Sequence, residues 1–157
     1  LDGCRVSRCG QVVPSVDGPA MTGHASADAR LRGAAEEAMT RAYAPYSGFR
    51  VGAALLTADG TIVAGCNVEN ASYPSGMCAE RGAVAAAVAL GHREFTHLVL
   101  VSEAEEPSPP CGFCRQVLVE FAPALQLTSR TTSGAEARWA LADLLPHQFT
   151  PQSLHQT

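Results

Sequence analysis

The sequence predicts an α/β protein with three α-β-α layers, in which helices cover both faces of one mixed sheet of about five strands. Segments with the apolar spacing of helices alternate with apolar segments of strand length along most of the chain. The first two strand segments and the last two are each separated by a short turn, which predicts antiparallel pairs. With 157 residues, 46% of them hydrophobic and 17% charged, the chain has the size and composition of one compact domain.

The N-terminal half of this pattern contributes one helix and one hairpin. Residues 27–43 carry small and apolar side chains at the spacing of one helical face, and Pro45 ends the helix. Two strands are expected at 51–57 and 61–68, because the Asp59-Gly60 pair between them marks a tight turn.

The second half places two helices directly after loops that contain cysteine. The alanine-rich residues 79–90 favour a helix that Gly91 closes, and residues 112–121 favour another that stops before Pro123. The other expected elements are a buried strand at 97–102, two final strands at 125–131 and 135–140, and a short helix at 141–145. Both cysteine segments therefore lie where strands give way to helices, the edge at which open α/β sheets usually bind ligands.

Residues 1–25 are rich in Gly, Pro, Ser and Val and have no clear periodicity. We expect them to form a tail, either disordered or foreign to the natural chain, followed by a single domain over residues 26–157. Two thiols of this tail, Cys4 and Cys9, are interpreted as incidental, the alternative being an additional metal or disulfide site.

Charge and cysteine content restrict the partners and the compartment. The formal net charge is −4 and all 11 basic residues are arginines, so no broad positive surface for a polynucleotide is expected. Six cysteines are too few for a disulfide-stapled secreted domain of this length. No segment has the length of a membrane span or the pattern of a signal peptide. We therefore expect a cytoplasmic protein with a small-molecule partner, no nucleic acid and no membrane.

Three of the cysteines have the spacing of a catalytic metal site. Cys78 begins a Cys-Ala-Glu-Arg segment, and Cys111 and Cys114 form a Cys-x-x-Cys pair, a spacing that also serves redox motifs and zinc fingers. A structural zinc site normally takes four protein ligands, whereas a catalytic site takes three and leaves one position for water. Three thiols therefore predict the catalytic type. Cys66 is the candidate fourth ligand of a closed site, if it does not simply pack as a small apolar group.

Charged residues next to these thiols complete a reactive site. Glu80 lies two residues after Cys78, and beside an open zinc position its carboxylate would accept a proton from water and deliver it elsewhere. Its alternative role is a first-turn acid favoured by the helix dipole. Three thiolates leave a zinc dication with net negative charge, which Arg81 and Arg115 are expected to offset from just outside the ligand set. Otherwise both arginines are surface charges.

Cys-Ala-Glu followed by Pro-Cys-x-x-Cys matches the zinc deaminase signature in its three-cysteine form. More specifically, the chain resembles the single-domain, homotetrameric cytidine deaminases from about residue 27 to residue 154. Five segments in order carry this resemblance: residues 42–49, 51–57, 65–73, 78–81 and 110–116.

This resemblance implies one zinc ion per chain, held by Cys78, Cys111 and Cys114. It implies hydrolytic deamination of cytidine and deoxycytidine to uridine and deoxyuridine, with release of ammonia, as a step of pyrimidine salvage. Zinc-bound hydroxide would attack C4 of the pyrimidine, while Glu80 would move protons to ring N3 and to the departing amino group.

The resemblance also implies contacts to the substrate. Asn67 and Glu69 would hold the ribose, since an amide and a carboxylate can together donate to and accept from sugar hydroxyls. Phe49 would contact the pyrimidine ring, and the backbone N–H of Ala79 would lie near the base. The alternatives are loop capping for Asn67 and Glu69 and core packing for Phe49.

Further contacts would come from a neighbouring chain of the homotetramer. Ala71 and Tyr73 would approach the 5′ side of the ribose, and Phe149 would cover the base from across an interface. Tyr73 and Phe149 would otherwise fill the interface without touching substrate.

The sequence leaves three other functions open. A deaminase of a related aminonucleoside would share the zinc motif, but the Asn67-x-Glu69 pair argues against it. A polynucleotide-editing enzyme would need a basic or aromatic strand channel, and the short turn at residues 132–134 predicts the antiparallel last strand of free-nucleoside enzymes. A non-catalytic, zinc-stabilised binding module is the alternative from a different class.

Overall fold

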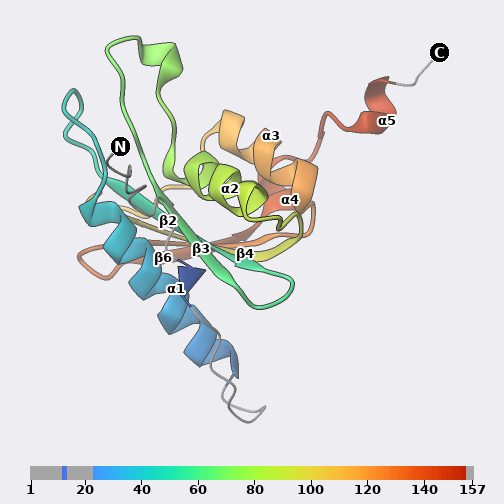
Figure 1. Ribbon diagram of the computed structural model, residues 1–157, viewed down its shortest axis with the longest axis horizontal. Coiled ribbons are helices and arrows are strands. Elements are labelled where there is room, and N and C mark those ends of the chain that lie inside the picture. Colours follow the sequence, from blue (N-terminus) through green and yellow to red (C-terminus); the bar gives the residue numbers. More distant parts are fainter. Residues whose placement is uncertain (1–11, 14–22, 155–157) are drawn as a thin grey trace, which may run out of the picture.

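Helices lie on both faces of one mixed sheet in the computed structural model, which describes residues 12–13 and 23–154 (Figure 1). Helix α1 (Gly23–Thr40) packs on one face of the sheet. Helices α2 (Ala79–Ala89), α3 (Gly112–Phe121) and α4 (Leu141–Leu144) pack on the other. The predicted three-layer α/β architecture is therefore confirmed. Across the described ranges, no helix combines the length and apolarity required to cross a lipid bilayer.

Five main strands form the sheet: β2 (Val51–Thr57), β3 (Ile62–Cys66), β4 (Phe95–Ser102), β5 (Gln126–Thr131) and β6 (Glu136–Ala140). They lie in the order β3-β2-β4-β5-β6, and the two-residue strand β1 (Val12–Val13) extends the β3 edge. Among the described strands, β4 and β5 pair in parallel and the other neighbours pair antiparallel. The mixed sheet and the antiparallel last strand are thus as predicted, and α3 is the crossover that joins the parallel pair.

Most element boundaries follow the sequence signals closely, and α3 begins and ends at the predicted residues. Helix α1 instead spans Gly23–Thr40, where a helix over residues 27–43 was expected. Two short helices were not predicted, the 3₁₀ turn η1 (Tyr73–Ser75) and α5 (Pro151–Leu154). Most of the expected tail over residues 1–25, with Cys4 and Cys9, lies outside the described residues. Within it, the structure describes β1 and the start of α1.

Alternate side chains of β4 reach the two faces of the sheet. Leu98 and Leu100 belong to the core beneath α2 and α3, whereas Val99 and Val101 pack beneath α1. All four are buried. The nearly continuous apolar run that predicted this strand therefore reflects a strand covered on both faces.

Two glycines let the helices approach neighbouring strands from opposite faces. A Cβ atom on Gly52 of β2 would lie 1.9 Å from the Ala35 carbonyl oxygen of α1. A Cβ atom on Gly65 of β3 would lie 2.3 Å from the Ala83 backbone nitrogen of α2. Because the interior is close-packed, a side chain at either position would push its helix away from the sheet.

We expect Gly52→Ala to destabilise the fold by about 3 kcal/mol, because the new methyl group meets backbone atoms of α1 that cannot rotate away. Urea unfolding followed by the fluorescence of Trp139 measures this change. Gly33→Ala is the matched control, since Gly33 lies in α1 with nothing within 4 Å of its Cβ position. Alanine there should stabilise by about 0.5–1 kcal/mol. Equal stability of the two variants would contradict this account of the helix–sheet contact.

Candidate active site

Two helix N-termini bring the three predicted thiol ligands together. Cys78 is the N-cap residue of α2 and Cys111 is that of α3, while Cys114 lies in the first turn of α3. Both N-cap residues have extended backbone, and neither side chain caps its own helix. The sulfurs are therefore available to a ligand at a place where the partial positive charge of both helices favours thiolates.

The three sulfurs form one cluster. Cys78 Sγ lies 3.9 Å from Cys111 Sγ, which lies 3.5 Å from Cys114 Sγ, and all three atoms lie within 4.8 Å of one another. At a Zn–S distance of about 2.3 Å, tetrahedral geometry places two sulfurs about 3.8 Å apart. The cluster therefore fits one zinc ion held by three thiolates.

Among the described residues, no further His, Cys, Asp or Glu joins this cluster. Cys66, the candidate fourth ligand, ends β3 and is not part of the group. Within the described part of the chain the site is therefore of the three-ligand type, which leaves a coordination position for water.

The sulfurs also differ in how readily they ionise. A hydrogen bond from the Cys114 thiol lowers the pKa of Cys78, and Cys111 and Arg81 lower it further against the opposing effect of burial. The same bond to Cys78, together with burial, raises the pKa of Cys114. Of these two thiols, Cys78 therefore carries negative charge more readily than Cys114.

Glu80 is the buried acid of the site. It lies in the first turn of α2, is 5% exposed, and lines a cavity of about 210 Å³ together with Cys78 and Cys111. Burial raises the pKa of its carboxyl group, and the negative charge of Cys78 raises it further. A carboxyl group of raised pKa beside metal ligands is suited to accept a proton and return it.

The cavity is lined by residues of strands β2, β4 and β5, of the loops next to the strands, and of the start of α2. Six of the predicted site residues line it: Phe49, Asn67, Cys78, Ala79, Glu80 and Cys111. The sequence analysis missed six others: Val51, Leu100, Ser102, Ser108, Pro109 and Ser129. Ser102 carries a local signal, a polar residue that ends an apolar strand. Ser129 reaches the cavity because it lies opposite Leu100 in the parallel β4–β5 register, which no local pattern reveals.

The side chain of Asn67 forms hydrogen bonds with the backbone on both sides of Arg50. Its Oδ1 accepts a hydrogen bond from the Val51 N–H at 2.8 Å, and its Nδ2 donates to the Phe49 carbonyl at 2.8 Å. These two bonds are the loop capping considered as the alternative to ribose binding. They also fix the end of the loop that carries Phe49 into the cavity.

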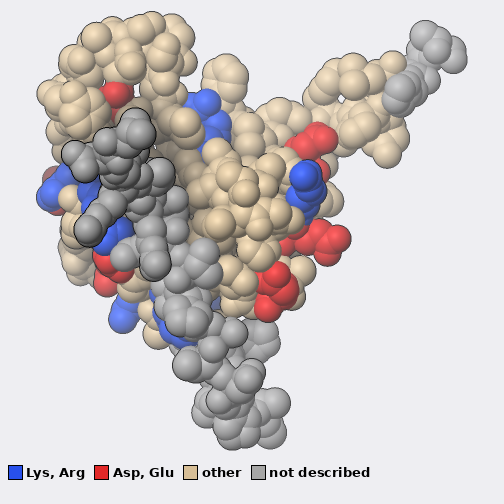
Figure 2. Space-filling model, viewed as in Figure 1, with Lys and Arg blue, Asp and Glu red and all other residues tan. Residues whose placement is uncertain are grey.

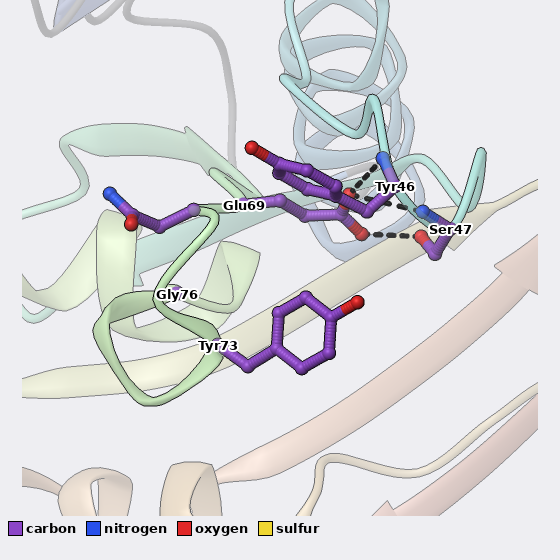
Figure 3. Close-up of a pocket in the computed structure, with 6 residues that line it drawn as sticks. Tyr46, Ser47, Glu69, Tyr73 and Gly76 are labelled. Carbon is purple, nitrogen blue, oxygen red and sulfur yellow. Dashed lines mark hydrogen bonds between the residues drawn. The ribbon is translucent and has the colours of Figure 1, made fainter.

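Glu69 holds the start of the same loop, as Figure 3 shows. Its carboxylate accepts hydrogen bonds from the Tyr46 N–H at 2.9 Å, from the Ser47 N–H at 3.2 Å and from the Ser47 hydroxyl. The hydroxyl, followed by the Tyr46 N–H, holds the pKa of Glu69 below its usual value. A carboxylate has about four acceptor sites, so these three bonds leave capacity for a sugar hydroxyl.

Glu69 also lies between the thiols and an aromatic cavity. A cleft of about 400 Å³ is lined by Cys78, Cys111, Asn67, Glu69 and Tyr73, among others. Glu69 and Tyr73 also line a further cavity of about 400 Å³ beside Tyr46 (Figure 3). The two tyrosine rings meet edge to face, 6.1 Å between centroids.

Arg81 lies close to the sulfur cluster. Its Nη2 donates to the Gly76 carbonyl at 2.8 Å, and its guanidinium lies over the Phe113 ring, 5.9 Å from the centroid. It is also one of the groups that lower the pKa of Cys78. The structure thus places this cation where it can reduce the negative charge on the thiolates.

Arg115 has a different environment. Its Nε donates to the Pro110 carbonyl at 2.7 Å and its Nη1 to the Leu144 carbonyl at 2.9 Å. These bonds tie the residue before Cys111 to the end of α4. The two hydrogen bonds of Arg115 therefore fix the backbone of the cysteine segment.

Three predicted contacts lie at or beyond the rim of the cavities. Ala71 and Tyr73 are exposed, Tyr73 by 78%. Phe149 is 59% exposed, and its carbonyl accepts a hydrogen bond from Gln116 Nε2 at 2.7 Å. Figure 1 shows the C-terminal segment with α5 projecting away from the sheet. Within this chain Phe149 is not among the lining of the 210 Å³ cavity.

Comparison with known proteins agrees with this geometry. Residues 25–127 match the family model described as the cytidine and deoxycytidylate deaminase zinc-binding region. The cytidine deaminase of Halalkalibacterium halodurans is 41% identical over 120 residues, covering 76% of this chain and 91% of that protein. The cytidine deaminase of Sporosarcina psychrophila is 43% identical over 126 residues, covering 80% and 93% respectively.

A solved structure gives the same result. The crystal structure of cytidine deaminase from Burkholderia pseudomallei has a TM-score of 0.74 and 46% sequence identity, and the match covers 82% of this chain and 100% of that one. Family model, relatives and fold thus agree with one another, and the family model is that of a zinc-binding region. The chain belongs to the cytidine and deoxycytidylate deaminase zinc-binding family.

Proposed function

We propose that the protein catalyses the hydrolytic deamination of cytidine and deoxycytidine, giving uridine or deoxyuridine and ammonia. The observation that carries this proposal is that three thiols form one cluster and that two of them, Cys78 and Cys111, line one cavity with the buried carboxyl group of Glu80. Family membership makes a pyrimidine nucleoside the substrate that fits this site. The role proposed for the protein is pyrimidine salvage in the cytoplasm, where a reducing environment keeps the thiols free.

Cys78, Cys111 and Cys114 would hold the zinc ion. When bound, zinc supplies the Lewis acidity that makes water nucleophilic at neutral pH. Glu80 takes a proton from the attacking water and gives it to ring N3, which makes C4 more electrophilic. The same carboxylate then passes the second proton of the water to the departing amino group. One water enters and one ammonia leaves, so Glu80 returns to its starting protonation state.

The remaining lining residues orient the nucleoside. The Phe49 ring packs against the pyrimidine, and the backbone N–H of Ala79 at the start of α2 donates to the base. Asn67 and Glu69 receive the ribose, since both line the cleft that leads away from the thiols. Charged groups are interspersed with uncharged residues on the face seen in Figure 2, in keeping with a small-molecule substrate.

A homotetramer with shared active sites completes the proposal. The large apolar side chains that stay exposed include several that line these cavities: Tyr46, Phe49, Val68, Tyr73, Met77 and Phe113. Exposed apolar patches of this kind mark interaction surfaces. A neighbouring chain would bring Ala71 and Tyr73 to the ribose and the projecting Phe149 to the base.

Glu80→Gln should lower kcat by a factor of about 10² to 10⁴ while the variant keeps its zinc and its fold, because the amide cannot carry the proton. An ultraviolet assay of cytidine turnover, together with metal analysis, measures both quantities. Glu120→Gln removes an exposed carboxylate from α3 and serves as the control with unchanged turnover. Near-normal kcat in Glu80→Gln would remove this residue from the mechanism.

Free cytosine should be a poor substrate, with kcat/KM lower than that of cytidine by at least about a thousandfold. The reason is that cytosine lacks the hydroxyl groups that Asn67 and Glu69 are proposed to bind. Initial rates for both compounds under identical conditions test the point. Similar kcat/KM values would defeat the ribose assignment.

Removal of metal should abolish turnover, and one equivalent of zinc per chain should restore it, because the thiols supply a single open site. Activity and far-ultraviolet circular dichroism are followed during treatment with a chelator. A zinc-stabilised binding module would instead unfold without metal and show no turnover of cytidine or deoxycytidine when zinc is present.

A further inference from the structure

The loop that carries Phe49 is held at both of its ends by side chains of one segment, those of Asn67 and Glu69. It joins α1 to β2, and residues 41–50 lie outside both elements. Asn67 fixes its end through the Val51 N–H and the Phe49 carbonyl. Glu69 fixes its start through the Tyr46 N–H and the Ser47 N–H. Phe49 is 41% exposed, so its position depends on these bonds more than on core packing.

The Ser47 hydroxyl connects the two anchoring points. It donates to Glu69 Oε1 and accepts a hydrogen bond from the Phe49 N–H at 3.0 Å. Gly48, between them, has φ = 69°, a left-handed conformation that glycine adopts without strain and that brings the Phe49 N–H back toward Ser47. The chain of bonds therefore runs from a carboxylate through one hydroxyl to the backbone of the base-contacting residue.

The chemistry of the Ser47 hydroxyl decides which group donates and which accepts in this series of hydrogen bonds. A serine hydroxyl can donate only one hydrogen bond, and here the Ser47 hydroxyl donates it to the Glu69 carboxylate. The acceptor side of the oxygen is thereby left to the Phe49 N–H, and the ionised carboxylate polarises both bonds. A shift of the Glu69 carboxylate therefore moves the backbone of Phe49 as well.

We propose that Ser47 is a positioning residue that couples the Glu69 carboxylate to the backbone of Phe49, so that ribose binding sets the position of the ring that packs on the base. The coupling to substrate rests on the function proposed above. It goes beyond separate ribose and base contacts, because it makes recognition of the base depend on occupation of the ribose site.

Hydrogen exchange at the Phe49 amide tests the coupling without any substrate. Ser47→Ala should speed exchange of this amide about tenfold, because the amide loses its acceptor in a charge-assisted chain. Glu69→Gln should also speed it, but only while Ser47 is present, so the double variant should exchange as fast as Ser47→Ala alone. Ser47→Thr keeps the hydroxyl and should stay within about twofold of the original protein.

Kinetics test the consequence for substrate. Ser47→Ala should raise KM for cytidine about tenfold with kcat changed less than about threefold, since Glu80 and the thiols are untouched. The preference for cytidine over 2′,3′-dideoxycytidine should shrink about fivefold in this variant. Ser47→Thr should restore both values. Ser133→Ala removes a serine bonded to Thr131 in the β5–β6 turn and should leave kinetics and Phe49 exchange unchanged.

Three outcomes would overturn the proposal. The first is an unchanged exchange rate of the Phe49 amide in Ser47→Ala. The second is an effect of Glu69→Gln on that rate that is equal with and without Ser47. The third is an equal loss of kcat/KM for cytidine and for its dideoxy analogue in Ser47→Ala. If zinc-loaded original protein deaminates neither compound, the proposed function fails. The exchange measurements still decide whether Ser47 couples Glu69 to Phe49.

Discussion

The active site depends on the meeting of three sulfur atoms from two helix N-termini. Cys78 and Cys111 precede different helices, and their sulfurs come within 3.9 Å because α2 and α3 cover the same face of the sheet. The parallel β4–β5 pair requires a crossover, and α3 provides it on that face. The position of α2 in turn depends on Gly65, since a Cβ atom there would meet the Ala83 backbone. A small feature of β3 thus sets where the first thiol lies.

Charge at this cluster is balanced over short distances. Three thiolates exceed the charge of a zinc ion by one unit, which weakens the metal as a Lewis acid. The two helix N-termini and Arg81 act against that excess. Glu80 is buried next to the same negative charge, so its carboxyl group holds a proton more readily than an exposed one. The cluster therefore favours both the thiolates that bind metal and an acid that exchanges protons.

Local sequence signals predicted the helices, the main strands and the thiol cluster well, because caps, turns and cysteine spacing act over a few residues. Contacts between distant segments were not predictable in the same way. The bonds of Glu69 to Tyr46 and Ser47 join residues 22 or 23 positions apart. Ser129 reaches the cavity only through strand register, and Arg115 bonds to the Leu144 carbonyl at the end of α4. Resemblance to a family supplied the ribose-binding roles proposed for Asn67 and Glu69, but not their bonds to the loop that carries Phe49.

X-ray absorption at the zinc edge of the metal-loaded protein tests the central claim most directly. The account predicts three sulfur ligands at about 2.3 Å and one light atom that is exchangeable water. A fourth sulfur, or a nitrogen from a histidine side chain, would show a closed structural site and would contradict the proposed chemistry.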